Sequence, residues 1–269
     1  MYDCHVHSTF SSDSEMPGEV ACEKACEIGL NGITFTDHMD IDFPDEEEFM
    51  IDFDIYFDSM KKLAEKYKNR LKVLIGLEAG FQPHVLEQTK GVINSHDFDF
   101  VIGSVHVVDG FDTYKPAYFD GLSKHEAYLK DMLAILDMVK TFDDFDIVGH
   151  FDYVIRKAPY EDRNLRYNEF SDIFDEIFKG LIEKGKGFEV NTSSFREKEG
   201  TITPVYDIDI LKRYRELGGE IITLGSDSHT PVHIGYKFEF FKYMLCKAGF
   251  RYIAHYENRN PVFEKIDTI

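Results

Sequence analysis

The chain has 269 residues, of which 43% are hydrophobic and 30% charged, and its formal net charge is −20. This composition is typical of a folded globular protein rather than a disordered one, and the length suits one large α/β domain. The excess of 50 acidic over 30 basic residues argues against a nucleic-acid partner or an anionic membrane surface, because both favour Lys and Arg. An anionic small molecule stays open as a partner, because bound divalent cations reverse the local field.

The sequence contains no run of 18 apolar residues, and its N-terminus enters a predicted strand without a charged leader and an apolar core. We therefore expect a soluble cytoplasmic protein. The four cysteines are Cys4, Cys22, Cys26 and Cys246, with no CxxC pair among them. We expect plain thiols, with neither a disulfide framework nor a zinc–thiolate site.

Short apolar runs alternate with longer amphipathic segments along the whole chain. Most of these runs are continuous in Val, Ile, Leu and Phe, which is typical of parallel strands covered on both faces. The predicted strands are residues 2–7, 32–37, 73–79, 98–106, 147–151, 187–192 and 221–226. The predicted helices are residues 17–29, 55–67, 123–139, 170–182, 204–217 and 238–248, the third of which opens on a capping box of Ser123 and Glu126.

Seven β/α units in sequence predict an α/β fold: a parallel barrel with an irregular strand count, in one domain that spans residues 1–269. An open, doubly wound sheet is the structural alternative. The barrel accounts better for the polar residues described next. They lie at or just past the C-terminal ends of the predicted strands, where barrels of this kind carry their chemistry.

Histidine and carboxylate residues recur at these strand ends. His5 and His7 are two residues apart on the first strand, so both side chains point to one face and can bind one metal ion. The complete candidate set is His5, His7, Asp13, His38, Glu78, His106, His150, Asp227 and His229. Six imidazoles and three carboxylates exceed the needs of one or two ions, and they suit three ions if Glu78 bridges two of them. Nitrogen and oxygen ligands without thiolate suit zinc, iron or manganese.

Other polar residues near these motifs have more modest expected roles. Asp3, Asp37 and Asp152 adjoin candidate ligands and are expected to accept hydrogen bonds from imidazoles. Asp13 lies in a polar loop, where turn formation is an adequate alternative role. His233 follows the last ligands closely and is a candidate for contact with substrate. The histidines outside the strand ends, expected at the surface, are His84, His96, His125 and His255.

Two long loops follow the second and fourth predicted strands. Residues 39–54 are rich in Asp and Glu, and the favoured interpretation is a solvated acidic loop. The alternative is a wall of the pocket that attracts a cationic part of the substrate. Residues 107–122 are rich in Gly, Asp, Tyr and Phe and are a candidate cover for the pocket.

The same motifs resemble those of the polymerase and histidinol phosphatase (PHP) family, in order along the whole chain. They are His5-Val6-His7, Thr36-Asp37-His38, Gly76-Leu77-Glu78, Gly103-Ser104-Val105-His106, His150, and Gly225-Ser226-Asp227-Ser228-His229. Within the family, the closer resemblance is to the stand-alone bacterial histidinol-phosphate phosphatases, carried by residues 99–106, 149–152, 189–193 and 252–259. The resemblance implies a distorted (β/α)7, TIM-like barrel, a centre of three divalent metal ions, and hydrolysis of L-histidinol phosphate in histidine biosynthesis.

Hydrolysis of a phosphomonoester also suits the residue chemistry. Metal ions lower the pKa of a coordinated water and hold phosphoryl oxygens. Arg156 and Arg196 follow the fifth and sixth strands, and a guanidinium group fits phosphate oxygens. Asn191 and Ser193 are weaker candidates for substrate contact. Candidates for protonating the leaving alkoxide are water on a metal ion, Asp227 and His233.

Two other functions stay open at this point. Another phosphoesterase of the same family, acting on nucleotides, phosphodiesters or phosphotyrosine, would use the same centre, although the net charge argues against long nucleic acid. A non-catalytic metal-binding module is a different class of protein, and the complete ligand set argues against it. An amidohydrolase-type barrel would need a bridging lysine after a middle strand, and no predicted strand ends in lysine.

Overall fold

The structure is a computed structural model that describes residues 1–44, 49–197 and 202–266. Within this part of the chain, seven parallel strands form one sheet in the order β1-β2-β4-β5-β8-β9-β10. Their bounds are β1 (Tyr2–Val6), β2 (Gly32–Phe35), β4 (Lys72–Gly80), β5 (Phe100–Ser104), β8 (Ile147–Val148), β9 (Gly187–Asn191) and β10 (Ile222–Gly225). Each of the seven predicted strands is present, with ends that differ from the prediction by up to three residues.

The two outermost strands of this sheet, β1 and β10, meet and nearly close it into a barrel. The N–H of Asp227 donates to the His5 carbonyl at 2.8 Å, and the N–H of His7 donates to the Ser228 carbonyl at 3.0 Å. Val6 and Ser228 also form a parallel bridge. The predicted (β/α)7 barrel is therefore confirmed, and the segment that carries His5 and His7 lies directly beside the segment that carries Asp227.

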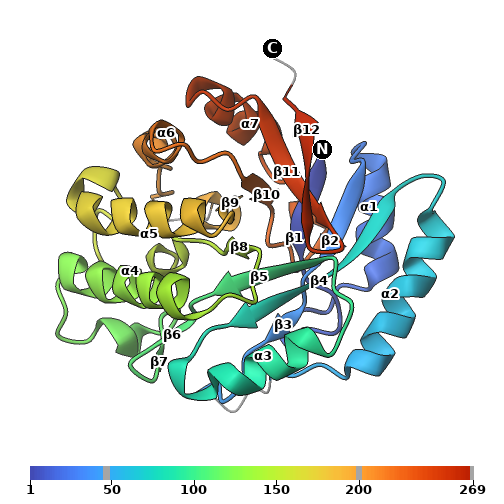
Figure 1. The fold of residues 1–269 in the computed structure, drawn as a ribbon, viewed down its shortest axis with the longest axis horizontal. Helices are drawn as coiled ribbons and strands as arrows, with labels where there is room; N and C mark the ends of the chain where they lie inside the picture. Colours follow the sequence, from blue (N-terminus) through green and yellow to red (C-terminus); the bar gives the residue numbers. More distant parts are fainter. Residues whose placement is uncertain (45–48, 198–201, 267–269) are drawn as a thin grey trace.

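The helices form an outer ring around the sheet (Figure 1). Those in the described residues are α1 (Gly18–Glu27), α2 (Phe53–Tyr67), α3 (Leu86–Asn94), α4 (Lys124–Thr141), α5 (Ser171–Glu183), α6 (Ile208–Glu216) and α7 (Phe238–Lys247). The capping box predicted at the start of α4 is present, because the Ser123 hydroxyl accepts from the Glu126 N–H while the Glu126 carboxylate accepts from the Ser123 N–H. Six of these helices were predicted, and α3 was not.

Shorter elements complete the fold. Beside the barrel strands lie β3 (His38–Met39), which extends alongside β4, and the hairpin of β6 (Val107–Val108) and β7 (Phe111–Asp112). The 3-10 turns are η1 (Pro83–Val85), η2 (Pro116–Phe119), η3 (Tyr153–Ile155), η4 (Tyr167–Glu169), η5 (Ser193–Phe195) and η6 (Pro231–His233). Several of these turns and the β6–β7 hairpin follow the C-terminal ends of strands, where they surround the site described below.

An antiparallel hairpin, β11 (Tyr252–Glu257) and β12 (Asn260–Lys265), covers the opposite end of the barrel (Figure 1). Its Tyr256 packs with Phe100 and Ile147, which lie at the starts of their strands. His255 is 3% exposed and its ring stacks on Tyr2 with 3.7 Å between ring centroids. The expectation that His255 is a surface residue was wrong, because this hairpin buries it.

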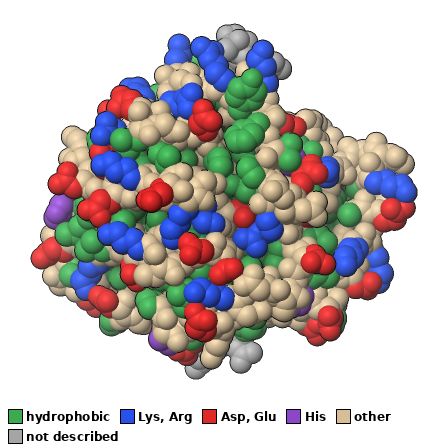
Figure 2. Space-filling model, in the orientation of Figure 1, with side chains coloured by type: hydrophobic (Ala, Val, Ile, Leu, Met, Phe, Trp, Pro, Cys, Tyr) green, Lys and Arg blue, Asp and Glu red, His purple; other side chains and the backbone are tan. Residues whose placement is uncertain are grey.

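The surface charge and the state of the cysteines can be compared with the expectations from the sequence. On the face seen in Figure 2, basic and acidic side chains are interspersed, so that face carries no basic stripe. All four cysteines are free thiols. Among the described residues, no helix combines the length and the apolar character that crossing a membrane requires.

Candidate metal centre

Glu78, near the end of β4, lies at the centre of the converging strand ends and is fully buried. Its Oε1 atom lies 3.1 Å from His106 Nε2 and 2.8 Å from His150 Nε2. Its Oε2 atom lies 3.0 Å from His5 Nε2 and 3.2 Å from His38 Nδ1. Because the two oxygens face different imidazoles, the carboxylate is placed to bridge two ions.

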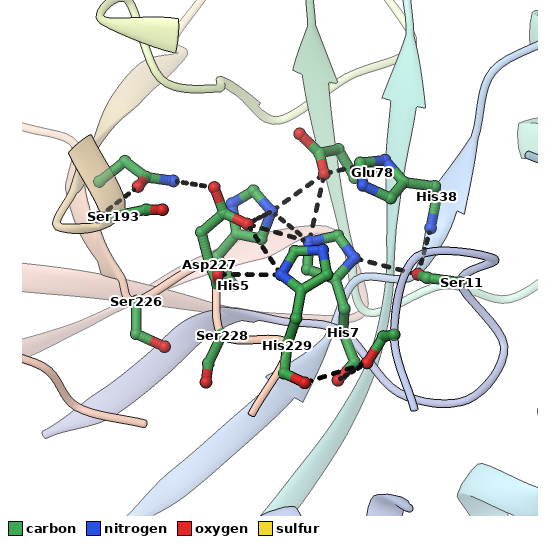
Figure 3. Close-up of polar contacts among 12 residues, drawn as sticks. His5, His7, Ser11, His38, Glu78, Ser193, Ser226, Asp227, Ser228 and His229 are labelled. Atoms are coloured by element: carbon green, nitrogen blue, oxygen red, sulfur yellow. Dashed lines mark hydrogen bonds and ion pairs between the residues drawn. The ribbon is translucent and has the colours of Figure 1, made fainter. Parts of the chain in front are cut away.

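The remaining candidate ligands extend this cluster toward solvent. Asp227 Oδ1 lies 3.4 Å from His7 Nε2 and 3.6 Å from His229 Nδ1. Asp13 Oδ2 lies 3.0 Å from His229 Nε2 and 3.8 Å from His38 Nε2. Figure 3 shows Glu78, His5, His7, Asp227 and His229 pointing toward one another. All nine side chains singled out in the sequence therefore meet in one site.

The ligand atoms form overlapping groups of the size that binds one ion. The groups whose atoms all lie within 4.8 Å of one another are His7–His38–His229, His5–His7–Asp227, His38–Asp40–His106 and Glu78–His106–His150. The donor set fits divalent cations, because His5 Nε2 and His7 Nε2 lie 3.0 Å apart, and two ring nitrogens at that distance must share a proton or a cation. Nitrogen and oxygen donors without thiolate suit zinc, iron or manganese. The Cys4 thiol points away, to the Ala254 carbonyl.

In three of the imidazoles, the Nδ1 atom contacts a polar side chain that orients the ring. His5 Nδ1 lies 3.0 Å from Glu189 Oε2, His7 Nδ1 lies 3.0 Å from Ser11 Oγ, and His106 Nδ1 lies 2.8 Å from Asp40 Oδ1. An acceptor at Nδ1 keeps the proton there and leaves Nε2 as the ligand atom. The Nε2 atoms of these rings are the ones that face Glu78 and Asp227.

Glu189 and Asp40 were missed in the sequence, although both gave a signal. Glu189 is the one charged residue of strand β9, between Phe188 and Val190. Asp40 follows His38 by two residues, which places it on the same face of an extended segment. Two of the three carboxylates that were predicted for this role have other contacts. Asp37 reaches an imidazole only through Ser11, and Asp3 accepts hydrogen bonds from backbone N–H groups of the segments that follow β10.

A pocket of about 460 Å³ opens over the ligands. Its basic and hydroxyl lining consists of Arg156, Arg163, Arg196, Lys115, Ser193, Ser194 and Thr230, and His233 also lines it. Its aromatic lining consists of Phe43, Phe49, Tyr114 and Tyr153. The structure therefore places the predicted residues Arg156, Arg196, Ser193 and His233 at the pocket. Asn191 is fully buried and lies outside this lining.

The two predicted arginines approach the segment of Asp227 from different sides. Arg156 Nη2 donates to Asp227 Oδ2 at 2.6 Å and to Asn191 Oδ1 at 3.2 Å. Arg196 Nη2 donates to the backbone carbonyls of Ser226 and Asp227, at 2.6 and 2.9 Å. Arg163, which the sequence analysis did not single out, donates to the Arg156 carbonyl at 3.2 Å. Three guanidinium groups thus lie on one side of an otherwise acidic site.

Both long loops reach the pocket, and the described part of the acidic loop lines it with aromatic side chains. From residues 39–54, Phe43 and Phe49 line the pocket. Asp40 contacts His106, Asp42 pairs with the exposed His84, and Asp52 caps α2. Residues 45–48 lie outside the described part of the chain. From residues 107–122, Asp112, Tyr114 and Lys115 line the pocket.

Fold and site together define a class, the α/β barrels with clusters of candidate metal ligands at the carboxyl ends of their strands. Residues 3–193 match the family model of the PHP domain, and the chain belongs to this family. It is 37% identical to the probable histidinol-phosphatase of Clostridium acetobutylicum over 244 residues, covering 89% of this chain and 90% of that protein. It is 35% identical to the histidinol-phosphatase of Lactococcus lactis over 253 residues, covering 94% of this chain and 93% of that protein.

A solved structure agrees with the family assignment. The crystal structure of histidinol phosphate phosphatase from Lactococcus lactis, complexed with zinc, L-histidinol and phosphate, matches this chain with a TM-score of 0.89 at 33% identity. The match covers 97% of this chain and 98% of that chain. The resemblance to the PHP family drawn from the sequence motifs is confirmed.

Proposed function

We propose that the protein is a histidinol-phosphatase, which hydrolyses L-histidinol phosphate to L-histidinol and phosphate in histidine biosynthesis. The observation that carries the proposal is that the nine candidate ligands converge in one cluster, and seven of them line one pocket together with the two predicted arginines. The relatives named histidinol-phosphatases, and the zinc, L-histidinol and phosphate bound in one of them, support the choice of substrate.

We further propose three divalent ions, because the donor groups overlap around Glu78 and continue past it to Asp13 and His229. Zinc is the metal present in the Lactococcus lactis structure. When bound, such ions supply an activated water and neutralise charge on the phosphoryl oxygens. In this chain, Glu78 would hold two of them, and the carboxylates Asp13 and Asp227 would complete the outer positions.

The phosphate group would lie beside the arginine side of the pocket. Arg156 and Arg196 present charged N–H donors there, and Ser193 lies next to them on η5. Charge-assisted hydrogen bonds of this kind both orient a phosphate and stabilise charge that develops on it. Asn191 would contribute indirectly, since its side-chain oxygen accepts from Arg156.

The leaving alkoxide must receive a proton. Asp227 is a poor donor: burial would raise its pKa, but Arg156 and His5 hold it well below the usual range, so the carboxyl stays ionised. His233, on η6 at the pocket, is the side chain that we propose instead, with water as the competing donor. For either donor, the bound substrate must place its leaving oxygen within hydrogen-bond distance of the donor.

A phosphate-release assay tests the proposal. The panel contains histidinol phosphate, nucleoside monophosphates, phosphotyrosine and a phosphodiester, each with protein of known metal content. We expect release from histidinol phosphate that stops with a chelator and returns with divalent metal. Glu78→Gln should abolish most activity and lower metal content, because that carboxylate contacts ligands on both sides of the site. Active protein free of transition metal and zinc would contradict the proposal.

A further inference from the structure

Glu189 lies on the inner face of the barrel and touches candidate ligands from two different metal groups. Its side chain is 2% exposed. Its Oε1 and Oε2 atoms lie 3.1 and 3.0 Å from His5 Nδ1. Oε1 also accepts from the backbone N–H of His150 at 3.0 Å and from Asn191 Nδ2 at 2.9 Å. One carboxylate therefore contacts the imidazole of one ligand and the backbone of another.

The barrel leaves room for this carboxylate at one position of the neighbouring strand. Gly225, the last residue of β10, pairs with Asn191 of β9. A Cβ atom at Gly225 would collide with Glu189 Oε2 and would lie 2.6 Å from His5 Cβ. Any larger residue at position 225 would push the side chains of Glu189 and His5 apart. The contact between Glu189 and His5 therefore requires a glycine at this position.

We propose that Glu189 is a positioning residue that sets the metal affinity of both groups. Through His5 it fixes the proton on Nδ1 and directs Nε2 toward the ion, and through the His150 N–H it fixes the backbone from which that ligand projects. Through Asn191 its influence extends to Arg156. The inference rests on the metal centre of the proposed function and not on its substrate.

The hydrogen-bond pattern makes Glu189→Gln a sharp test, because an amide cannot replace this carboxylate. With the amide oxygen at the Oε1 position, that oxygen stays 3.1 Å from His5 Nδ1, but an NH2 group replaces the oxygen at 3.0 Å and opposes a proton on Nδ1, so the ring loses one of its two acceptors. With the oxygen at Oε2, the NH2 group faces the donors of His150 and Asn191 instead. Either orientation loses a contact that the carboxylate makes.

We expect Glu189→Gln to bind divalent metal about 10- to 100-fold more weakly, measured by competition with a chromophoric chelator. The visible absorption of the Co²⁺-loaded protein should also change, because the geometry around His5 changes. Glu189→Asp keeps the charge on a side chain that is one methylene shorter. Its metal affinity should therefore fall between those of Glu189→Gln and the unsubstituted protein. If Glu189→Gln does not fold, Glu189→Asp provides the test.

The matched control is Asp146→Asn, a buried carboxylate before β8 that accepts from Arg259 Nε and from the Val101 N–H. This variant should lose stability and keep the metal affinity and the Co²⁺ spectrum of the unsubstituted protein. Unchanged affinity and spectrum in both Glu189 variants would overturn the inference, as would an unsubstituted protein that binds no metal. All measurements omit substrate, so a different substrate would leave the result intact.

Discussion

The two oxygens of the Asp227 carboxylate have different surroundings. Oδ1 faces the imidazoles of His7 and His229, while Oδ2 accepts from Arg156. The backbone of Asp227 is left-handed, with a φ of 53°, a conformation that Asp tolerates better than most residues. The arginine therefore neutralises one oxygen and leaves the other facing the histidines, and it connects the phosphate position that we propose to a candidate metal ligand.

Replacing Arg156 distinguishes a direct contact with phosphate from an effect on metal binding through Asp227. We expect Arg156→Ala to lower kcat/KM for histidinol phosphate by about tenfold or more, at ~1.5–3 kcal/mol per charged hydrogen bond. Metal content should stay near normal, because Oδ1 is the oxygen that faces the histidines. Arg156→Lys should recover only part of the activity, since an ammonium lacks the planar fork. Loss of metal in parallel with activity would show instead that Arg156 acts through Asp227.

Asp131, on α4, gives a prediction of stability against pH. Its side chain is 1% exposed, its Oδ1 atom has no hydrogen-bond partner among the described residues, and burial raises its pKa well above the usual value. The folded protein therefore keeps this proton longer than the unfolded chain. The contribution is present below the unfolded pKa of about 4 and is lost as pH rises through the folded pKa.

Asp131→Asn should remove the loss of stability that accompanies deprotonation of Asp131 at high pH. The free energy of unfolding of the variant should exceed that of the unsubstituted protein by about 1 kcal/mol or more at pH 8, with a smaller difference at pH 5. Chemical denaturation at both pH values, with equal metal loading, measures this. A difference that does not grow with pH would contradict the argument.

At the residue scale, the sequence was enough to select the nine candidate ligands that converge in the structure, but not the residues that orient them. Eight of these nine candidates lie at or just past strand ends, a position that periodicity locates, and Asp13 lies in the loop after β1. Glu189 and Asp40 act through contacts with His5 and His106 from other strands, and such contacts depend on which strands become neighbours. A single buried acid in an apolar strand signals a partner without identifying it.

At the scale of elements, the barrel strands were predictable because most of them are continuous apolar runs, and all but β9 carry or lead into candidate ligands. The missed elements lack such signals. Helix α3 has nine residues with Gly91 in its middle, which weakens its helical pattern. The β11–β12 hairpin turns at Asn258 and Arg259, both with positive φ, and arginine is not a residue typical of that conformation.

The end of β10 is the element on which the closure of the barrel depends. We expect Gly225→Ala to weaken metal binding and to destabilise the protein, because a Cβ there displaces Glu189 or His5. Gly91→Ala is the matched control, since a Cβ at that helical position meets open space. The control should raise stability by up to about 1 kcal/mol and leave metal binding unchanged. Equal effects of both variants on metal affinity would refute this account.

At the scale of the whole molecule, an anionic substrate must enter a protein of net charge −20. The pocket itself can attract an anion, because its arginines and the metal ions that we propose make it locally positive. The lining also includes four aromatic side chains, and Asp112 as a carboxylate outside the nine candidate ligands. A phosphate joined to a cationic, ring-containing group matches both halves of such a pocket, whereas the far end of a nucleotide carries no positive charge.

We therefore expect kcat/KM for histidinol phosphate to exceed that for any nucleoside monophosphate or phosphotyrosine by at least about tenfold, the equivalent of one charged contact. Asp112→Asn should raise KM for histidinol phosphate by about tenfold, the equivalent of one charged hydrogen bond, and should leave KM for a plain aryl phosphate nearly unchanged. Asp42→Asn is the matched control, because Asp42 pairs with His84 at the surface and lies outside the pocket lining. Equal shifts of KM for both substrates in Asp112→Asn would remove that carboxylate from substrate recognition. A nucleotide turned over as well as histidinol phosphate would overturn the substrate assignment and keep the metal-dependent phosphatase.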